Sequence, residues 1–253
     1  MSWLVPQNSL TQYQEKAVEL KPDLHRIIMG APGSGKTLVL LHRACHLRSS
    51  LNVPEDRFKI FVFNNVLKTY IKSAFELLGL PDDCVSTFDK WCMDYHKDHI
   101  SKKLPKSGDT KYADYPAIRK AVLNHIKSLP SDLPRFEFVM VDEGQDLDGV
   151  AFEIIKRIAC HVTVCMDHKQ RIYELGSSES EIATKLGVCA KNIHLLDAFR
   201  CCPYIAKMAS KLISNEEERE QYLNQVRMEQ GARQTPLLYY VHNHDDEMRR
   251  LIE

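Results

Sequence analysis

The 253-residue sequence lacks an excess of charge of either sign. Lys plus Arg and Asp plus Glu number 34 each, so the formal net charge is zero. Such a chain has no global field that draws it to nucleic acid or to a membrane surface, and any such contact must come from a local patch or groove. The hydrophobic fraction of 44% is that of an ordinary globular protein with a buried core.

The sequence also lacks a leader and a long apolar run. Its first ten residues, MSWLVPQNSL, contain no basic region followed by an apolar stretch, and no segment approaches the length of a membrane span. We therefore expect a cytoplasmic protein without membrane contact. Internal repeats and low-complexity tracts are absent from the sequence as well.

None of the eight cysteines forms a C-x-x-C pair, which disfavours a zinc or dithiol site. Cys45, Cys160 and Cys165 lie in apolar surroundings and are predicted to be reduced core thiols. A zinc site remains an alternative, because residue types that bind zinc occur close together in CMDYHKDH and again further on. Its candidate ligands are Cys92, His96, His99, His242 and His244.

Short apolar runs alternate with stretches of helical periodicity, a pattern typical of an α/β fold with a mostly parallel sheet flanked by helices. The predicted strands are 26–29, 59–63, 136–141, 161–166 and 192–196. The predicted helices are 36–50, 64–79, 149–160 and 201–214. Strands that are apolar on both faces lie inside such a sheet, where ligands collect at the carboxyl ends of the strands.

Two polar stretches interrupt this alternation. Residues 92–133 are charged and read as an inserted excursion with a short helix at 117–128. Residues 214–236 are predicted to be a solvated helix or a linker. Beyond them we expect a strand at 237–241 and a helix at 245–253.

The stretch MGAPGSGKT has the G-x-x-x-x-G-K-[ST] spacing of a phosphate-binding loop, placed between a predicted strand and a predicted helix. Glycines let backbone N–H groups turn toward phosphates, and the positive end of the following helix attracts anions. Lys36 is expected to reach the terminal phosphates, and the Thr37 hydroxyl is suited to hold Mg²⁺. The predicted nucleotide-binding residues of the loop are Gly30, Gly33, Ser34, Gly35, Lys36 and Thr37.

An apolar strand that ends in two adjacent carboxylates supplies a second candidate group. In FVMVDEGQD, Asp142 is placed to hold the metal together with Thr37, and Glu143 is placed to orient or deprotonate a water molecule. This pair favours hydrolysis over transfer of the phosphoryl group to a bound acceptor.

Several motifs follow one another in the order found in superfamily 1A helicases of the UvrD/Rep type. LTQYQEKAV precedes the phosphate loop, and FVFNNVLKTYI, VSTFDKWC, VDEGQD, MDHKQRIY and LLDAFRCCPYI follow it. VDEGQD is close to the family's V-D-E-x-Q-D, and MDHKQRIY contains its D-x-x-Q-x-I-Y. The sequence resembles this family from residue 10 to about residue 205, which implies a RecA-like motor that uses ATP and Mg²⁺ to move on single-stranded DNA, with RNA as an open alternative.

The resemblance also implies roles for individual residues. Gln14 corresponds to a glutamine that reads adenine, and Phe199 to an aromatic residue that stacks on the base. Gln145 and Gln170 correspond to sensors of the terminal phosphate, and Arg200 to an arginine that neutralises charge in the transition state. The positions that contact single-stranded DNA are Phe63, Asn64, Thr87 and Phe88. For Phe63 and Phe88, a place in the core at a strand end is the alternative.

Some features depart from the family pattern. Leu38 stands where many relatives carry an arginine, and Met166 replaces the usual glycine. Nothing after Arg200 resembles the late motifs. We therefore expect residues 1–195 to form a first RecA-like domain with an insertion at about 92–133, and residues 196–253 to form a hinge and the incomplete beginning of a second motor domain.

Two other functions compete with a motor. The chain is alternatively a nucleotide-dependent switch, or a partner-binding module of a larger complex, without unwinding activity; the zero net charge and the missing late motifs favour this reading. Phosphoryl transfer to a small acceptor is disfavoured by Gln145 and by DHKQRIY, for which a kinase has no evident need.

Overall fold

The computed structural model describes residues 4–63, 68–69, 75, 77–108, 112–129, 136–167, 176–188, 193–195, 197–198, 203–225 and 227–228. The chain divides into two compact units, residues 1–196 and residues 197–253.

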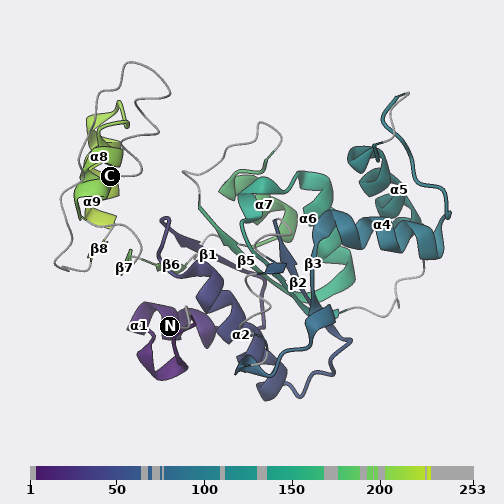
Figure 1. Cartoon of the computed structure of the whole chain (residues 1–253), viewed down its shortest axis with the longest axis horizontal. Helices are drawn as coiled ribbons and strands as arrows, with labels where there is room; N and C mark the ends of the chain where they lie inside the picture. Colours follow the sequence, from purple (N-terminus) through teal and green to yellow (C-terminus); the bar gives the residue numbers. More distant parts are fainter. Residues whose placement is uncertain are drawn as a thin grey trace, which may run out of the picture. The chain divides into compact units, whose positions relative to one another are not determined.

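The first unit contains a six-stranded sheet in which neighbouring strands are parallel (Figure 1). Its strands are β1 Arg26–Gly30, β2 Phe58–Val62, β3 Val85–Thr87, β4 Phe136–Val141, β5 Ala159–Met166 and β6 Ile193–Leu195. Their order across the sheet is β3-β2-β4-β5-β1-β6. Strand β5 therefore lies between β1, which leads into the phosphate loop, and β4, which leads into the acidic pair.

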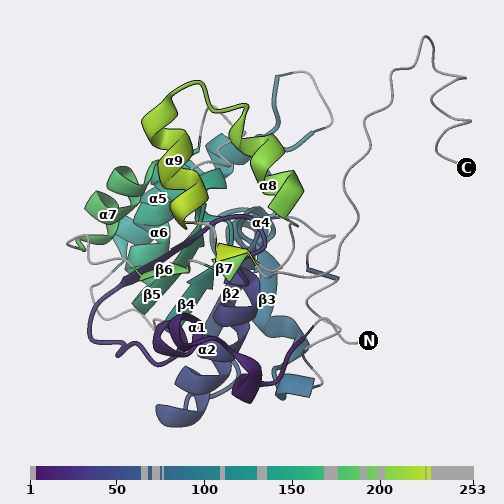
Figure 2. The same ribbon diagram turned by 90° about the vertical axis from the view of Figure 1, so that its left-hand side faces the viewer.

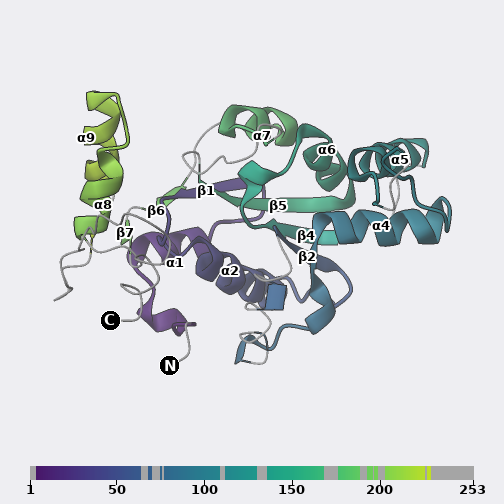
Figure 3. The ribbon, with the colours of Figure 1, turned by 45° about the horizontal axis from the view of Figure 1, so that its top comes forward.

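Helices cover both faces of this sheet. They are α1 Gln12–Val18, α2 Lys36–Ser50, α4 Phe88–His99, α5 Tyr115–Ser128, α6 Gly149–Ile158 and α7 Glu179–Leu186. Short 3₁₀-helices occur at η1 Gln7–Ser9, η2 Asp82–Cys84 and η3 Gly144–Asp146. Figures 2 and 3 show α1 and α2 on one face of the sheet and α5, α6 and α7 on the other.

Successive strand residues point to opposite faces of the sheet and so join two separate apolar cores. Ile28 and Met140 lie in the core that α1 and α2 close. Val139 and Val164 lie in the core on the other face, together with Phe152 of α6. Burial on both faces accounts for the nearly continuous apolar sequence of these strands.

Side-chain caps set the start of several helices. Thr11 and Gln14 form a reciprocal capping box at the start of α1, and Ser178 and Glu181 form another at the start of α7. Such caps satisfy N–H groups that have no partner within the helix.

The five predicted strands are confirmed, and β4 has the predicted bounds. Helix α2 also has its predicted bounds, and α6 ends at Ile158, two residues before the predicted end. The predicted helix at 64–79 lies mostly outside the described residues. The unpredicted elements include β3, α1 and α7, which have only three, seven and eight residues.

Residues 92–133 contain more regular structure than the sequence predicted, while their status as an insertion in the first domain stays a prediction. The predicted helix at 117–128 is present as α5, but a second helix, α4, precedes it and begins at Phe88. Cys92 of α4 and Val122 of α5 are buried in the same core as the strands. This segment therefore helps to close one face of the sheet.

The second unit has a small parallel pair of its own, β7 Asp197–Ala198 with β8 Arg227–Met228, and the helices α8 Pro203–Ser210 and α9 Glu216–Gln225. Helix α8 lies within the helix predicted at 201–214, and α9 lies within the polar stretch 214–236. The elements predicted at 237–241 and 245–253 fall outside the described residues. None of the described helices in either unit is long and apolar enough to cross a membrane.

Candidate nucleotide site

The loop between β1 and α2 has the backbone of a phosphate cradle. Gly33 and Gly35 have φ angles of 79° and 84°, in the left-handed region that only glycine adopts without a steric penalty. Gly35 is the N-cap of α2, so the first turn of that helix opens directly from the loop. N–H groups and the positive end of α2 are thereby available to an anion.

Lys36 bends back over this loop. Its Nζ donates hydrogen bonds of 3.0 Å to the carbonyl oxygen of Gly30 and 3.3 Å to that of Ala31. The Lys36 side chain is largely buried, so its ammonium group is held against the phosphate loop. A phosphate oxygen entering there would give the ammonium group a charged acceptor in place of neutral ones, which strengthens the hydrogen bond.

Thr37 and Asp142 meet at the start of α2 and the end of β4. The Thr37 hydroxyl donates a hydrogen bond of 2.7 Å to Asp142 Oδ2. Burial, followed by the negative charge of Glu143, raises the pKa of Asp142 to about 6, and the hydrogen bond from Thr37 opposes this shift. A buried carboxylate in this setting gains stability from a cation placed beside it.

These two oxygen groups fit Mg²⁺, a hard cation that is bound by one or two protein oxygens together with phosphates and water.

No group of three or more His, Cys, Asp or Glu side chains that could hold a metal occurs in the described part of the chain. The zinc alternative gains no support from its described members: His96 Nδ1 contacts the Ser101 carbonyl oxygen at 3.0 Å, and burial raises the pKa of the Cys92 thiol.

Cys45, Cys84, Cys92, Cys160 and Cys165 are free thiols. Cys165 is buried and Cys45 half-buried, but Cys160 is exposed. The prediction of a core position was therefore wrong for Cys160. It lies near the start of β5, where its strand neighbours Ala159 and His161 face inward.

Glu143 and Gln145 are fixed relative to each other at the end of β4. Glu143 has φ and ψ of 49°, a left-handed conformation that is uncommon for a residue other than glycine. Gln145 Nε2 donates a hydrogen bond of 2.8 Å to Glu143 Oε2, and Gln145 Oε1 accepts one of 3.0 Å from the backbone N–H of Asp167. Gln145 thus joins the carboxyl ends of β4 and β5.

Gln14 packs against the phosphate loop from α1. Its Oε1 accepts the N–H of Thr11 at 3.0 Å, and its Nε2 donates to the Ser34 carbonyl oxygen at 3.1 Å. A Cβ atom on Gly35 would lie 2.5 Å from Gln14 Nε2, so a larger residue there would displace the Gln14 amide. The amide retains one N–H and one lone pair for a further partner.

The candidate nucleic-acid residues occupy two adjacent strand ends. Val62 lies opposite Thr87 in the pairing of β2 with β3, so Phe63 and Thr87 are at the same edge of the sheet. Phe63 is 38% exposed, whereas Phe88 is 2% exposed and meets the Phe61 ring edge-on at 5.3 Å. Phe88 is therefore a core residue in this structure, and its predicted role in base stacking is corrected.

Four predicted site residues lie outside the described residues. They are Asn64, Gln170, Phe199 and Arg200. Sequence reasoning missed the bond from Gln145 to the backbone of Asp167 and the buried contacts of Arg43 on α2. A single basic residue within the apolar run LVLLHRACHL was the available signal for the second of these.

A parallel sheet with a glycine-rich phosphate loop after one strand and a buried acid after another defines the fold of P-loop nucleoside triphosphatases. A family model described as an AAA domain matches residues 14–175. This is more than half of the chain, and the chain belongs to that family, which implies that the loop binds a nucleotide. No curated protein matches the chain.

Similar solved structures include Pif1 helicase from Candida albicans, with 15% identity over 74% of this chain and 39% of that chain and a TM-score of 0.44. Bacteroides Pif1 bound to ssDNA has 14% identity over 70% of this chain and 36% of that chain, with a TM-score of 0.34. AMPPCP-bound DnaA from Aquifex aeolicus has 16% identity over 83% of this chain and 54% of that chain, with a TM-score of 0.34. The chain spans less than two fifths of the length of the two Pif1 chains, at 39% and 36%.

Proposed function

We propose that this chain is the ATP-hydrolysing motor domain of a superfamily 1 helicase of the UvrD/Rep type, which moves on single-stranded DNA. One observation carries the proposal: the contact of Thr37 with Asp142 stands next to a Glu143 carboxylate that Gln145 holds in place. A nucleotide-binding loop alone serves many functions, but an oriented carboxylate beside the metal-binding pair suits activation of water.

The residues divide the work on ATP between them. N–H groups of the loop and the Lys36 ammonium group bind the phosphates, and Thr37 and Asp142 would hold Mg²⁺. When bound, Mg²⁺ neutralises negative charge on the phosphate oxygens. Glu143 then orients the attacking water and accepts its proton, while its own position is fixed by the Gln145 amide.

The remaining site residues complete the proposed cycle. Gln14 reads the adenine edge with its unused N–H and lone pair. Phe199 stacks on the base, Gln170 senses the terminal phosphate together with Gln145, and Arg200 neutralises charge as the phosphoryl group transfers. The last three roles rest on the family resemblance alone.

Coupling to the nucleic acid passes through Gln145 in this proposal. Gln145 contacts the catalytic carboxylate on one side and the end of β5 at Asp167 on the other. Loss of the terminal phosphate would shift Glu143 and release this link, so the end of β5 would respond to hydrolysis. Phe63 and Thr87 then bind the single-stranded DNA at the sheet edge formed by β2 and β3. Phe63 stacks on a base, and the Thr87 hydroxyl contacts a phosphate.

The zero net charge of the chain favours one competing function, a nucleotide-dependent switch in a larger complex. The two functions differ in one measurable property. A motor hydrolyses ATP faster when single-stranded DNA is present, whereas a switch binds ATP without such stimulation.

The test is steady-state ATP hydrolysis by the full chain, with and without a homopolymeric single strand of DNA or RNA. We expect low basal hydrolysis by this chain and stimulation of at least fivefold by the strand. We expect Glu143→Gln to abolish the stimulation while ATP affinity stays within about threefold. ATP binding with no stimulation by either strand would favour the switch. Stimulation by RNA alone would correct the choice of nucleic acid.

A further inference from the structure

Arg43 of α2 is a completely buried cation whose contacts all lie within the protein. No ion pair between described residues includes Arg43. A buried charge without a carboxylate is costly unless polar groups surround it on all sides. The groups that do so here belong to two different elements, the end of α1 and strand β5.

On the α1 side, Arg43 closes the end of the helix. Its Nη1 donates to the carbonyl oxygens of Ala17 at 3.4 Å, Val18 at 2.9 Å and Leu20 at 2.6 Å. Carbonyl oxygens at a helix C-terminus lack partners within the helix and carry the negative end of its dipole. The guanidinium group therefore satisfies groups that the seven-residue helix α1 would otherwise leave unpaired.

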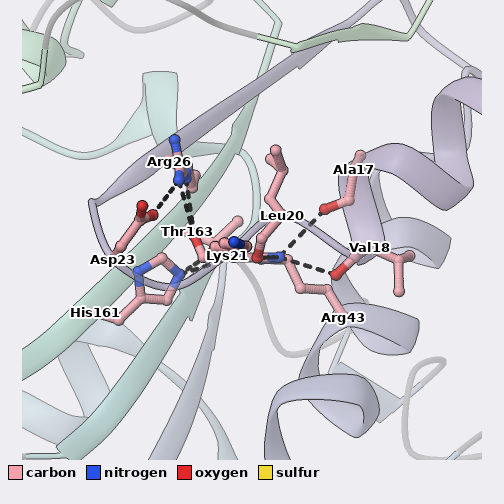
Figure 4. A network of polar contacts seen from close by, with 9 residues as sticks. All are labelled: Ala17, Val18, Leu20, Lys21, Asp23, Arg26, Arg43, His161 and Thr163. Atoms are coloured by element: carbon pink, nitrogen blue, oxygen red, sulfur yellow. Dashed lines mark hydrogen bonds and ion pairs between the residues drawn. The ribbon is translucent and has the colours of Figure 1, made fainter. Parts of the chain in front are cut away.

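On the β5 side, Arg43 is held by two side chains. Its Nε donates to Thr163 Oγ1 at 2.9 Å, and its Nη2 lies 3.0 Å from His161 Nε2 (Figure 4). Since a guanidinium group only donates, His161 Nε2 is the acceptor and carries no proton. Figure 4 shows Arg43 between these two residues and the carbonyl groups of Ala17, Val18 and Leu20.

We infer that Arg43 is a positioning residue for nucleotide binding and acts through Gln14. Helix α1 carries Gln14, and Gln14 donates to the Ser34 carbonyl oxygen of the phosphate loop. By tying the end of α1 to α2 and β5, Arg43 holds the Gln14 amide against that loop. This inference rests on the proposed nucleotide binding and goes beyond it by assigning a role to a residue remote from the phosphates.

A nearby arginine provides a matched control. Arg26 donates to the Lys21 carbonyl oxygen through Nε and Nη2, at 3.1 and 2.9 Å, and pairs with Asp23. It holds the turn between α1 and β1, and its hydrogen bonds and ion pair with described residues lie within that turn. Arg26→Lys should therefore lower stability without changing nucleotide affinity.

Arg43→Lys keeps the charge but replaces the planar five-donor group, so it cannot reach α1 and β5 together. In the full chain, we expect ATP affinity measured by calorimetry to fall about tenfold for Arg43→Lys and for Gln14→Ala. If Arg43 acts through Gln14, the double variant Gln14→Ala with Arg43→Lys should also be only about tenfold weaker. Circular dichroism establishes that each variant is folded.

Amide exchange gives a second readout. Arg43→Lys should speed exchange of the α1 amides, while Arg26→Lys should leave them protected. Should Arg43→Lys fail to fold, Thr163→Val removes one acceptor of Arg43 with little change in shape. We expect Thr163→Val to weaken ATP binding about threefold, without further loss in the Gln14→Ala background.

Three outcomes overturn the inference while leaving the proposed function intact. The first is unchanged ATP affinity in folded Arg43→Lys, and the second is a double variant weakened about a hundredfold, the product of the single effects. The third is an Arg26→Lys variant that weakens ATP binding as much as Arg43→Lys does. A folded wild-type chain that binds no ATP overturns the proposed function first, and is recognised before any variant is compared.

Discussion

The Gln145 amide donates a hydrogen bond of 2.8 Å to the Glu143 carboxylate while its own oxygen accepts the backbone N–H of Asp167 at 3.0 Å. An amide can serve both partners at once because it has donors at one atom and an acceptor at the other. A carboxylate at this position has no donor when ionised. The chemical difference between Gln and Glu at residue 145 is therefore the sharpest probe of how Glu143 is held.

Gln145→Glu should lower kcat for ATP hydrolysis by about tenfold to a hundredfold and leave ATP affinity within about threefold. The substitution places a second negative charge beside Glu143 and removes the bond that orients it. Steady-state kinetics, with affinity measured separately by calorimetry, provides the check. Gln7→Glu, at an exposed position in η1, is the matched control and should retain the wild-type kcat. Equal kcat values for the two variants would contradict the role of Gln145.

Thr37→Val should weaken the binding of Mg²⁺ more than it weakens the binding of ATP. The variant removes the hydroxyl that lies 2.7 Å from Asp142 Oδ2 but keeps the volume of the side chain. We expect the Mg²⁺ concentration for half-maximal hydrolysis to rise by at least tenfold, and Thr37→Ser, which restores a hydroxyl, to return it to within about threefold. A Mg²⁺ titration of the three proteins makes the comparison. Indistinguishable titrations for Thr37→Val and wild type would place the metal elsewhere.

His161 should make the fold sensitive to acid. Burial, followed by the positive charge of Arg43, lowers its pKa to about 3, while the ordinary value is 6.5. Between these values the unfolded chain binds a proton that the folded chain does not, so the free energy of unfolding falls as pH falls below 6.5. From pH 7.5 down to pH 5 the loss is about 2 kcal/mol for this one group.

The measurement is the difference in unfolding free energy between wild type and His161→Gln at pH 7.5 and pH 5. The difference is needed because other groups titrate in the same range: His25 acts in the same direction, and Asp142 and Asp146, whose pKa values are raised to about 6, act in the opposite one. Wild type should lose about 2 kcal/mol more than the variant. The same pH dependence in both proteins would show that His161 is protonated in the folded state.

Substitutions of Phe63 and Phe88 should have different effects, the first on nucleic-acid binding and the second on stability. Phe88→Ala opens a cavity in the core and should lower the free energy of unfolding by about 3–5 kcal/mol. Phe63 lies at a partly exposed end of β2, so Phe63→Ala should cost little stability. It should weaken the binding of single-stranded nucleic acid by about 1–3 kcal/mol, the range for one stacked base. Wild-type binding itself should be weak and fall steeply with salt, given the zero net charge.

Fluorescence anisotropy with a labelled oligonucleotide and urea unfolding provide the two measurements. Tight binding that persists at high salt would place the main contact elsewhere on the chain. Equal strand affinity for wild type and Phe63→Ala would remove Phe63 from the proposed interface.

The sequence predicted those parts of the fold that local pattern determines. The bounds of β4 and α2 followed from mostly apolar stretches and from the glycine that ends the phosphate loop. It also placed Thr37 and Asp142 at the same sheet edge, because both follow strands of one parallel sheet. Spacing within a motif and the common direction of the strands were enough for this.

Other features depend on contacts that no local pattern reveals. An aromatic residue at a strand end suits either a base or the core, and Phe88 is buried because Phe61 and Trp91 pack against it. The second partner of Gln145 is the backbone N–H of Asp167, directly after β5, to which side-chain identity gives no clue. Arg43 was missed because its acceptors are mostly carbonyl groups, which every residue has.

Calorimetric titration of ATP and Mg²⁺ into wild type and Lys36→Ala tests the central claim most directly. Lys36 Nζ lies over the phosphate loop within 3.0 Å of the Gly30 carbonyl oxygen, where the account places the terminal phosphates. Removing one charge-assisted contact should cost about 1.5–3 kcal/mol and weaken binding by about tenfold to a hundredfold. Equal ATP affinity for both folded proteins, or no ATP binding by the wild type, would contradict the assignment of this loop as the nucleotide site.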